Sequence, residues 1–262
     1  MKVAIITGAS SGMGKEFVNE ALRFDFDEIW VIARRKERLE ALKSEAEKRG
    51  AKTKIVPLPL DLTRDGAISE LSQKLSDIRP DMRLLVNASG YGKFGEFSSS
   101  EESDVAGMCD LNLKALILIT RAVLPYMSGG AKILEVGSIS SFMPVPSLPV
   151  YAATKAAVLS FTRSLNHELK PRKIRAMCLC PYWVKTEFFN RANDKVKIKK
   201  LDVLYEPDFI AKKAFKALYK TKKDYLVPGG YAKTILLASK ILPHKLIMKI
   251  TDKKFRFKKQ DV

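Results

Sequence analysis

Cysteine and histidine are scarce in this chain of 262 residues, and no long apolar run is present. Three cysteines, Cys109, Cys178 and Cys180, cannot build a disulfide framework, which points to a reducing compartment. With two histidines and no Cys-x-x-Cys spacing, we expect no metal site. No apolar stretch is long enough to cross a bilayer, and the apolar run at residues 3–6 is too short for a secretory signal. We therefore expect a cytoplasmic protein with structural thiols.

Acidic residues are also few relative to basic ones, and the net charge is +18. From Asn190 to the C-terminus, 20 lysines and arginines stand against 7 acidic residues, a net +13. Charge concentrated in this way predicts an anionic partner such as membrane headgroups, nucleic acid or an acidic carrier. A solvated lysine-rich surface explains the same count equally well. The charge is accompanied by no nucleic-acid reading motif, so we expect no nucleic-acid partner.

Residues 1–228 lack a linker rich in glycine, serine or proline, and short apolar runs alternate there with helical patterns. The patterns predict strands at 3–7, 28–33, 53–58, 83–87, 131–137, 174–180 and 225–227, and helices at 12–24, 36–49, 63–78, 112–127, 151–170 and 207–219. Strands and helices alternating at this spacing indicate βαβ units and a parallel sheet covered on both faces. We expect one doubly wound α/β domain, long enough to bury a substantial core.

A glycine-rich turn lies between the first strand and the first helix. Glycines there let the backbone approach a pyrophosphate at the helix N-terminus, where free N–H groups favour anions. The spacing differs from G-x-G-x-x-G, so the prediction depends on the position of the turn after strand one. The residues expected to bind a dinucleotide here are Gly8, Ser10, Ser11, Gly12, Met13 and Gly14.

The end of the second predicted strand decides between NAD and NADP. An acidic residue at this place binds the ribose 2′-hydroxyl of NAD, but this chain has Arg34 and Arg35, whose guanidinium groups suit a 2′-phosphate. We therefore predict NADP(H). Alternatively, the two arginines pair with Glu37 and Glu40 of the following helix. The ends of strands three and four predict further contacts to the adenine and ribose, from Asp61, Leu62, Asn87 and Ala88.

Tyr151 and Lys155 stand four residues apart, with Ser138 thirteen residues before the tyrosine. A lysine one helical turn away lies on the same face as the tyrosine and favours its phenolate, which would lower a pKa of about 10. The Ser138 hydroxyl would hold a carbonyl or alcohol oxygen beside the phenol. This group suits proton transfer to or from an oxygen while a hydride moves on the adjoining carbon.

These motifs together resemble the short-chain dehydrogenase/reductase family over residues 1–228. The resemblance rests on Thr7-Gly8-x-x-x-Gly12-x-Gly14, the Asn87–Gly90 turn, Asn112, Ser138, Tyr151-x-x-x-Lys155 and Pro181-x-x-Val184-x-Thr186. It implies a Rossmann-type three-layer fold with seven parallel strands in the order 3-2-1-4-5-6-7. It also implies a homodimer or homotetramer that associates through the helices at 112–127 and 151–170.

The resemblance implies a role for each matching residue. Tyr151 would be the general acid/base, and Lys155 would lower its pKa and bind the nicotinamide ribose. Ser138 would bind the substrate oxygen, and Asn112 would kink its helix and support a proton-relay water. The nicotinamide would be contacted by Pro181, Val184 and Thr186. The implied activity is an NADPH-dependent carbonyl reductase; the alternative is a non-catalytic NADP(H)-binding sensor of the same fold.

The chain departs from the family pattern where the usual Pro-Gly after strand six is Pro181-Tyr182, and where the usual Asn-Asn-Ala-Gly is Asn87-Ala88-Ser89-Gly90. Tyr182 could narrow the nicotinamide pocket or stack on substrate. With Tyr182, Phe188 is a candidate substrate contact, because the family places its substrate lid in the segment 187–206.

Residues 229–262 form an apolar and basic extension rather than an independent domain. Apolar residues such as Ile235 and Leu242 alternate with lysines, and Pro243 is expected to divide the segment into two helical pieces. Basic amphipathic helices lie in anionic membrane interfaces, so one prediction is peripheral membrane contact through residues 231–259. Packing on the same subunit or across a dimer is the alternative. Membrane contact would favour a hydrophobic substrate.

Overall fold

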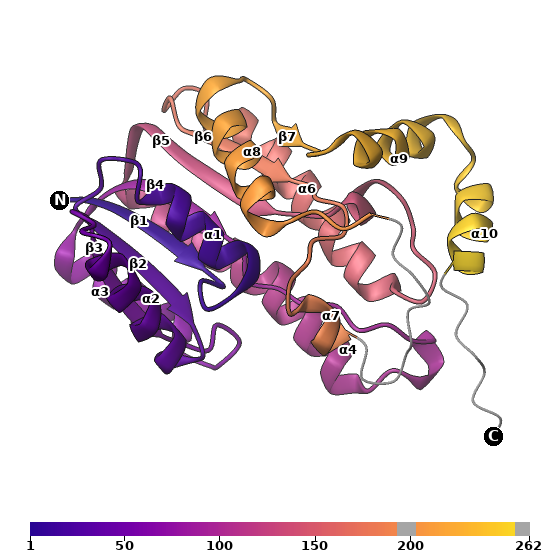
Figure 1. The fold of residues 1–262 in the computed structure, drawn as a ribbon, viewed down its shortest axis with the longest axis horizontal. Coiled ribbons are helices and arrows are strands. Elements are labelled where there is room, and N and C mark those ends of the chain that lie inside the picture. The colour runs from indigo at the N-terminus through magenta and orange to yellow at the C-terminus, as the bar shows by residue number, and fades with distance from the viewer. Residues whose placement is uncertain (193–202, 255–262) are drawn as a thin grey trace.

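Seven parallel strands form the central sheet (Figure 1). The computed structural model describes residues 1–192 and 203–254. The strands are β1 (Lys2–Thr7), β2 (Glu28–Ala33), β3 (Lys54–Pro59), β4 (Asp81–Asn87), β5 (Met127–Val136), β6 (Arg175–Leu179) and β7 (Tyr225–Leu226). They lie in the order β3-β2-β1-β4-β5-β6-β7, and every neighbouring pair is parallel. The expected sheet order and three-layer fold are confirmed.

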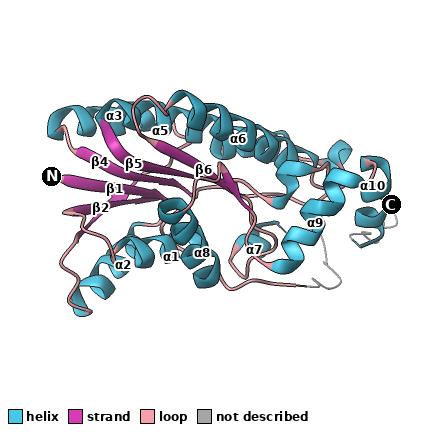
Figure 2. Cartoon of the chain, turned by 90° about the horizontal axis from the view of Figure 1, so that it is seen from above, coloured by secondary structure: helices cyan, strands magenta, loops and turns pink. Residues whose placement is uncertain are grey.

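Helices cover both faces of the sheet (Figure 2). They are α1 (Gly12–Ala21), α2 (Lys36–Lys48), α3 (Ala67–Ile78), α4 (Glu102–Cys109), α5 (Leu116–Val123), α6 (Pro149–Glu168), α7 (Phe188–Ala192), α8 (Pro207–Lys220), α9 (Gly230–Ile241) and α10 (His244–Lys254). One layer contains α1, α2 and α8, and the other contains α3, α5 and α6. Successive β1 side chains point to opposite faces, so Ala4 and Ile6 join the first core while Val3 and Ile5 join the second.

The helix predicted over 112–127 has different bounds. The helical run begins at Glu102 with α4, passes through a π-helical turn at Asp110–Ala115 and continues as α5. It ends in a 3-10 turn at Leu124–Tyr126, where Pro125 cannot donate a backbone hydrogen bond. Met127 belongs to β5 instead. The other predicted helix starts and ends agree to within a few residues.

The C-terminal extension folds into α9 and α10, which Leu242 and Pro243 separate as expected. Both helices lie beyond the carboxyl ends of the strands (Figure 2). Ala232, Ile235 and Leu236 of α9 pack against the body of the protein. Among the described residues, no helix combines the length and the apolar character that a membrane span needs.

The first turn is packed so closely that it excludes a side chain at Gly14. A Cβ atom added to Gly14 would lie 2.1 Å from the carbonyl oxygen of Gly8. The Thr7 hydroxyl accepts hydrogen bonds from the backbone N–H groups of Ala88 and Ser89, at 3.1 and 3.2 Å, and so joins this turn to the end of β4. The ends of β1 and β4 and the start of α1 therefore form one rigid unit.

Gly14→Ala is expected to lower the free energy of unfolding by about 1–3 kcal/mol, because the new methyl group must displace backbone. Urea unfolding followed by circular dichroism measures this change. Gly230→Ala is the matched control, since a Cβ there meets nothing within 4 Å. Equal midpoints for the two variants would contradict the close packing at Gly14.

Candidate active site and nucleotide pocket

A polar cavity of about 650 Å³ lies at the carboxyl ends of β1, β2 and β3. Its lining includes most of the predicted cofactor residues, namely Gly8, Ser10, Ser11, Gly12, Met13, Gly14, Arg34, Arg35, Asp61, Leu62, Ala88 and Thr186. The Ser11 side chain makes no hydrogen bond to the first turn of α1, although Ser11 is the residue before the helix. The N-terminal amides of α1 are thus available to an anion in the cavity.

Asn87 does not face this cavity. Its side-chain amide donates to the Thr120 hydroxyl at 3.0 Å and to Glu135 Oε1 at 3.3 Å, between α5 and β5. The Asn87 side chain is therefore part of the core, and the predicted approach of Asn87 to the ribose stays a prediction for its backbone. The chain leaves β4 with this side chain turned into the core, and the following residues, Ala88 to Tyr91, reach the cavity wall.

Three arginines line the polar cavity, and one of them was not predicted. Arg34 lies 4.0 Å from the Asp61 carboxylate. Arg35 donates to the hydroxyls of Ser10 and Ser11, at 3.0 and 2.9 Å, and to Glu187 at 2.8 Å. Arg38, in the first turn of α2, binds the other oxygen of Glu187. The position of Arg38 one turn beyond Arg35 is the sequence signal that could have identified it.

The Glu187 carboxylate shows what this arginine cluster can bind. Hydrogen bonds from Arg35 and then Arg38 hold the pKa of Glu187 below its ordinary value. Arg34 and Arg35 thus pair with Asp61 and Glu187 rather than with Glu37 or Glu40 of α2. Guanidinium groups that donate hydrogen bonds to both oxygens of a carboxylate can bind the oxygens of a phosphate in the same way.

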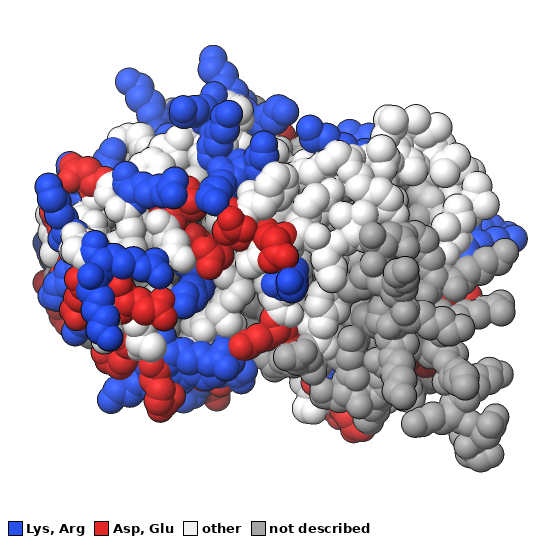
Figure 3. Space-filling view, viewed as in Figure 1, with Lys and Arg blue, Asp and Glu red and all other residues white. Residues whose placement is uncertain are grey.

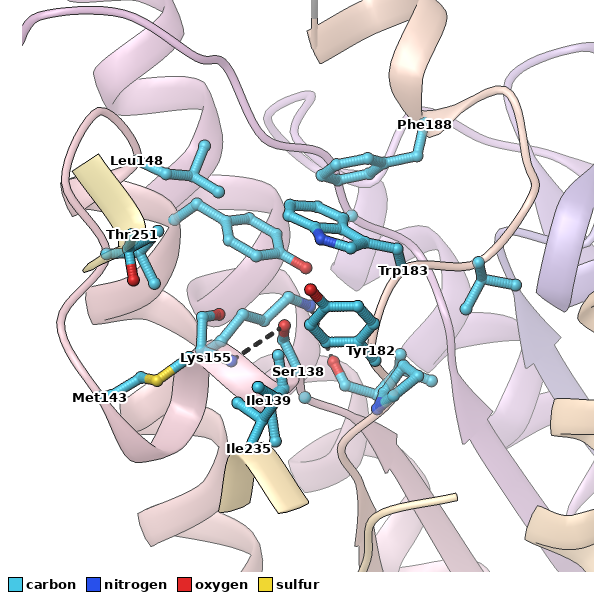
Figure 4. A pocket seen from close by; sticks show the side chains of 18 of the residues that line it. Ser138, Ile139, Met143, Leu148, Lys155, Tyr182, Trp183, Phe188, Ile235 and Thr251 are labelled. Atoms are coloured by element: carbon cyan, nitrogen blue, oxygen red, sulfur yellow. Dashed lines mark hydrogen bonds between the residues drawn. The ribbon is translucent and has the colours of Figure 1, made fainter. Parts of the chain in front are cut away.

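Ser138 and Lys155 lie close together in the wall of one cavity at the carboxyl end of β5 (Figure 4). Ser138 caps the 3-10 turn Ile139–Phe142, and its oxygen accepts a hydrogen bond from the Ser140 N–H at 3.2 Å. Helix α6 brings Tyr151 and Lys155 to the same place. A hydrogen bond from Ser138 stabilises the phenolate form of Tyr151. The Lys155 ammonium is buried, donates to the Val136 carbonyl at 2.7 Å and lies 5.6 Å from the centre of the Tyr151 ring.

The expected lowering of the Tyr151 pKa is not found. Burial raises the pKa of this phenol to about 12, and the hydrogen bond from Ser138 only partly offsets that rise. Burial also lowers the pKa of Lys155 to about 8. The physical reason is that both groups lose water, which disfavours the charged form of each. The phenol therefore carries its proton at neutral pH, and the Lys155 charge is directed to the Val136 carbonyl.

Asn112 lies in the π-helical turn between α4 and α5 and is fully buried. Its side chain donates to the Tyr91 carbonyl at 2.8 Å and accepts from the Tyr91 N–H at 2.9 Å. It also donates to the Thr154 hydroxyl at 3.2 Å. These bonds join the π-helical turn, the loop after β4, and α6. The proton-relay water at Asn112 stays a prediction.

A second, mostly apolar cavity of about 220 Å³ adjoins Ser138, Tyr151 and Lys155. Tyr182 and Phe188, the predicted substrate contacts, both line it, as do Pro181, Val184 and Thr186. The Phe188 ring lies 5.6 Å from the Tyr151 ring, and Tyr182 packs edge-on against Tyr231 of α9 at 5.3 Å. Of the expected lid, residues 193–202 lie outside the described residues.

Sequence reasoning missed much of the wall of this apolar cavity. The unpredicted wall residues include Met143, Val145 and Leu148 after β5, Ile235 and Leu242 from α9 and the segment after it, and Ile247 and Ile250 from α10. Single apolar residues in a loop or a terminal helix give no local signal of a binding site. They become recognisable only when the fold brings them opposite Tyr151.

Glu135 of β5 is a buried carboxyl that no motif predicted. Its Oε1 accepts from the Thr120 hydroxyl at 2.8 Å and from the Asn87 amide, whereas Oε2 has no hydrogen-bond partner among the described residues. Burial raises the pKa of Glu135 from 4.5 to about 7, against the opposing effect of these hydrogen bonds. The group therefore titrates close to neutral pH, one residue before the carbonyl that holds Lys155.

Comparison with known proteins gives one consistent answer. The sequence profile of a family described as short chain dehydrogenase matches residues 2–197. The chain is 32% identical over 200 residues to 3-oxoacyl-[acyl-carrier-protein] reductase FabG of Thermotoga maritima, covering 75% of this chain and 79% of that protein. It is 30% identical over 192 residues to very-long-chain 3-oxoacyl-CoA reductase-A of Danio rerio, covering 71% of this chain and 59% of that protein.

Solved structures agree with these sequence relatives. A short-chain dehydrogenase from Sphingobium yanoikuyae in complex with NADPH superposes with a TM-score of 0.79 at 26% identity. The match covers 95% of this chain and 96% of that one, so it includes much of the C-terminal extension. The similarity therefore extends beyond the residues that the family profile matches.

Glu135→Gln is expected to stabilise the protein at about pH 8 and to flatten its stability profile between about pH 5 and 7. The folded carboxyl has the higher pKa, so the folded state binds more protons between 4.5 and about 7, and stability falls as pH rises through that window. The rise of the Glu135 pKa from 4.5 to about 7 corresponds to a loss of ~3 kcal/mol in the free energy of unfolding across this pH window. Urea midpoints across this pH range measure it.

A suitable control is Glu40→Gln, which changes an exposed carboxyl on α2. Parallel pH profiles for wild type and Glu135→Gln would show that the buried carboxyl does not titrate in this window.

Proposed function

The chain belongs to the short-chain dehydrogenase family and is an oxidoreductase, and we propose that it reduces a hydrophobic or acyl-linked ketone with NADPH, using Tyr151 as the proton donor. One observation carries the proposal: the polar and the apolar cavity adjoin beside the catalytic residues. Both cavities are lined by Met13, Ala88, Gly90, Thr186 and Phe188. A dinucleotide in the first cavity would therefore reach a substrate in the second.

The donor groups that line the polar cavity fit NADPH. The glycine turn and the N-terminus of α1 would hold the pyrophosphate, and Arg34, Arg35 and Arg38 would hold the 2′-phosphate. The end of β2 carries no acid for the 2′-hydroxyl of NAD. NADPH, when bound, supplies the hydride that reduces the carbonyl carbon.

The protein's own residues would supply the proton and hold the oxygen. The Ser138 oxygen accepts from Ser140 N–H, and the hydroxyl proton that Ser138 gives to Tyr151 would turn to a carbonyl oxygen bound between the two groups. Tyr151, protonated at neutral pH because its pKa is raised, would give its proton to the same oxygen. Charged Lys155, close to the ring, would stabilise the phenolate that remains until solvent returns the proton.

The apolar lining favours a hydrophobic substrate and excludes water from the reacting oxygen. Two relatives named as 3-oxoacyl reductases support an acyl-linked ketone. The other candidate, a non-catalytic NADP(H) sensor, accounts for the polar cavity but leaves the group of Ser138, Tyr151 and Lys155 without a role. A panel of lipid, steroid, sugar and acyl-thioester carbonyls, assayed with NADPH, separates the reductase from the sensor. A sensor would bind NADPH but would not oxidise it with any of these carbonyls.

Tyr151→Phe is expected to lower kcat by about 10²–10⁴-fold, because the proton donor is removed while both cavities keep their shape. NADPH oxidation with the best substrate of the panel measures turnover, and NADPH fluorescence checks that cofactor binding is retained. Tyr126→Phe, which removes a phenol remote from both cavities, is the control. Near-normal turnover of Tyr151→Phe would refute the assignment.

Arg34→Ala is expected to weaken NADPH binding by roughly 10- to 100-fold and NADH binding far less, since only NADPH carries the 2′-phosphate. Titration of each cofactor by fluorescence gives the two affinities. Arg49→Ala, at the far end of α2, is the matched control. If both cofactors were weakened equally, Arg34 would be a structural residue.

A further inference from the structure

Helices α9 and α10 carry apolar side chains that point in two directions. On one side, Ile235 and Ile247 line the apolar cavity. On the other side, Leu237, Ile241 and Leu246 are 58%, 69% and 44% exposed to solvent. Figure 3 shows the surface over these two helices as largely uncharged, with basic side chains at its edges. Exposed apolar side chains gathered on two neighbouring helices mark an interaction site.

The apolar cavity opens at the same surface. Leu242 and Ile250 line the cavity, yet they are 37% and 48% exposed. A residue that both lines a cavity and contacts solvent marks the cavity's mouth. Leu242 follows α9 directly and Ile250 belongs to α10, so the mouth lies between the two helices. The route to Tyr151 is therefore bordered by exposed apolar residues.

The charge around this mouth is almost entirely positive. The described side chains of residues 229–252 include four lysines, Lys233, Lys240, Lys245 and Lys249, and one acid, Asp252. Lys233, Lys245 and Lys249 are exposed on the same two helices as Leu237, Ile241 and Leu246. Apolar side chains with lysines beside them match the acyl region and the anionic headgroups of a bilayer.

We propose that this α9–α10 face, formed by Leu237, Ile241, Leu246 and the neighbouring lysines, docks on the surface of an anionic lipid bilayer. Docking would place the cavity mouth at the acyl region, so that a ketone dissolved in the membrane enters without crossing water. The docking itself is independent of the reaction, whereas the delivery of substrate rests on the proposed function.

A second copy of the chain fits this surface less well. Lysine is depleted in protein–protein interfaces, but here lysines lie among the exposed apolar residues. A second copy seated on Leu242 and Ile250 would also cover the cavity mouth that a substrate must pass. A bilayer would also cover the mouth, but a hydrophobic substrate dissolved in the bilayer could still enter the cavity.

Co-sedimentation with vesicles of phosphatidylcholine, with or without about one third phosphatidylglycerol, tests the docking. The full chain is expected to bind the anionic vesicles at least tenfold more tightly than the neutral ones. Leu237→Ser/Ile241→Ser and Lys245→Glu/Lys249→Glu should each reduce binding roughly 10-fold or more. Ile78→Ser and Lys48→Glu/Lys52→Glu, on the opposite end of the molecule, should bind like wild type.

Retained binding in both surface variants, or no binding by wild type, would overturn the proposal. Size-exclusion chromatography of the same proteins without vesicles tests whether a second copy of the chain covers this face instead. That would be the conclusion if wild type does not bind vesicles and Leu237→Ser/Ile241→Ser changes a dimer into a monomer. Circular dichroism confirms that each variant is folded.

Delivery is tested with a long-chain ketone dissolved in the anionic vesicles. Wild type should reduce it roughly 10-fold faster than Leu237→Ser/Ile241→Ser, while both reduce a short water-soluble ketone at the same rate. Equal rates on the vesicle-borne ketone would refute delivery. The Tyr151→Phe variant should bind vesicles like wild type. If wild type binds vesicles but reduces no ketone with NADPH, the proposed function is refuted and the docking stands.

Discussion

The hydrogen bond from the Lys155 ammonium to the Val136 carbonyl joins helix α6 to the end of strand β5, and the site depends on that connection. A buried ammonium without a partner is costly, so the bond fixes where α6 lies along the sheet. The Ser141 hydroxyl adds a second connection by donating to the Lys155 carbonyl at 2.7 Å. Together they set Tyr151 of α6 against Ser138 after β5.

The same burial determines the proton chemistry. A dry environment keeps the Tyr151 phenol protonated and brings the pKa of Lys155 to about 8, so the resting pair suits proton donation to an oxygen. Glu135 belongs to the same environment, and its carboxyl, with a pKa of about 7, partly opposes the lowering of the Lys155 pKa by burial. Three titratable groups therefore depend on how water is excluded from the end of one strand.

The two cavities are built mainly by opposite ends of the chain. The polar cavity is built by the N-terminal strands and their turns, and Glu187 closes part of it against Arg35 and Arg38. The apolar cavity takes its outer wall from α9 and α10 at the C-terminus. The C-terminal extension is thus part of the cavity that we propose to bind substrate, which neither its lysine content nor its helical pattern indicated.

The sequence alone determined the features that depend on local spacing. The alternation of strands and helices, the glycine turn at Gly8–Gly14 and the helical spacing of Tyr151 and Lys155 follow from residue types a few positions apart. The tertiary structure decided what depends on burial and on distant partners: the raised Tyr151 pKa, the inward turn of Asn87, and the pairing of Glu187 with Arg35 and Arg38. Desolvation and ion pairing are set by which residues pack together, and residues far apart in the chain meet only in the folded protein.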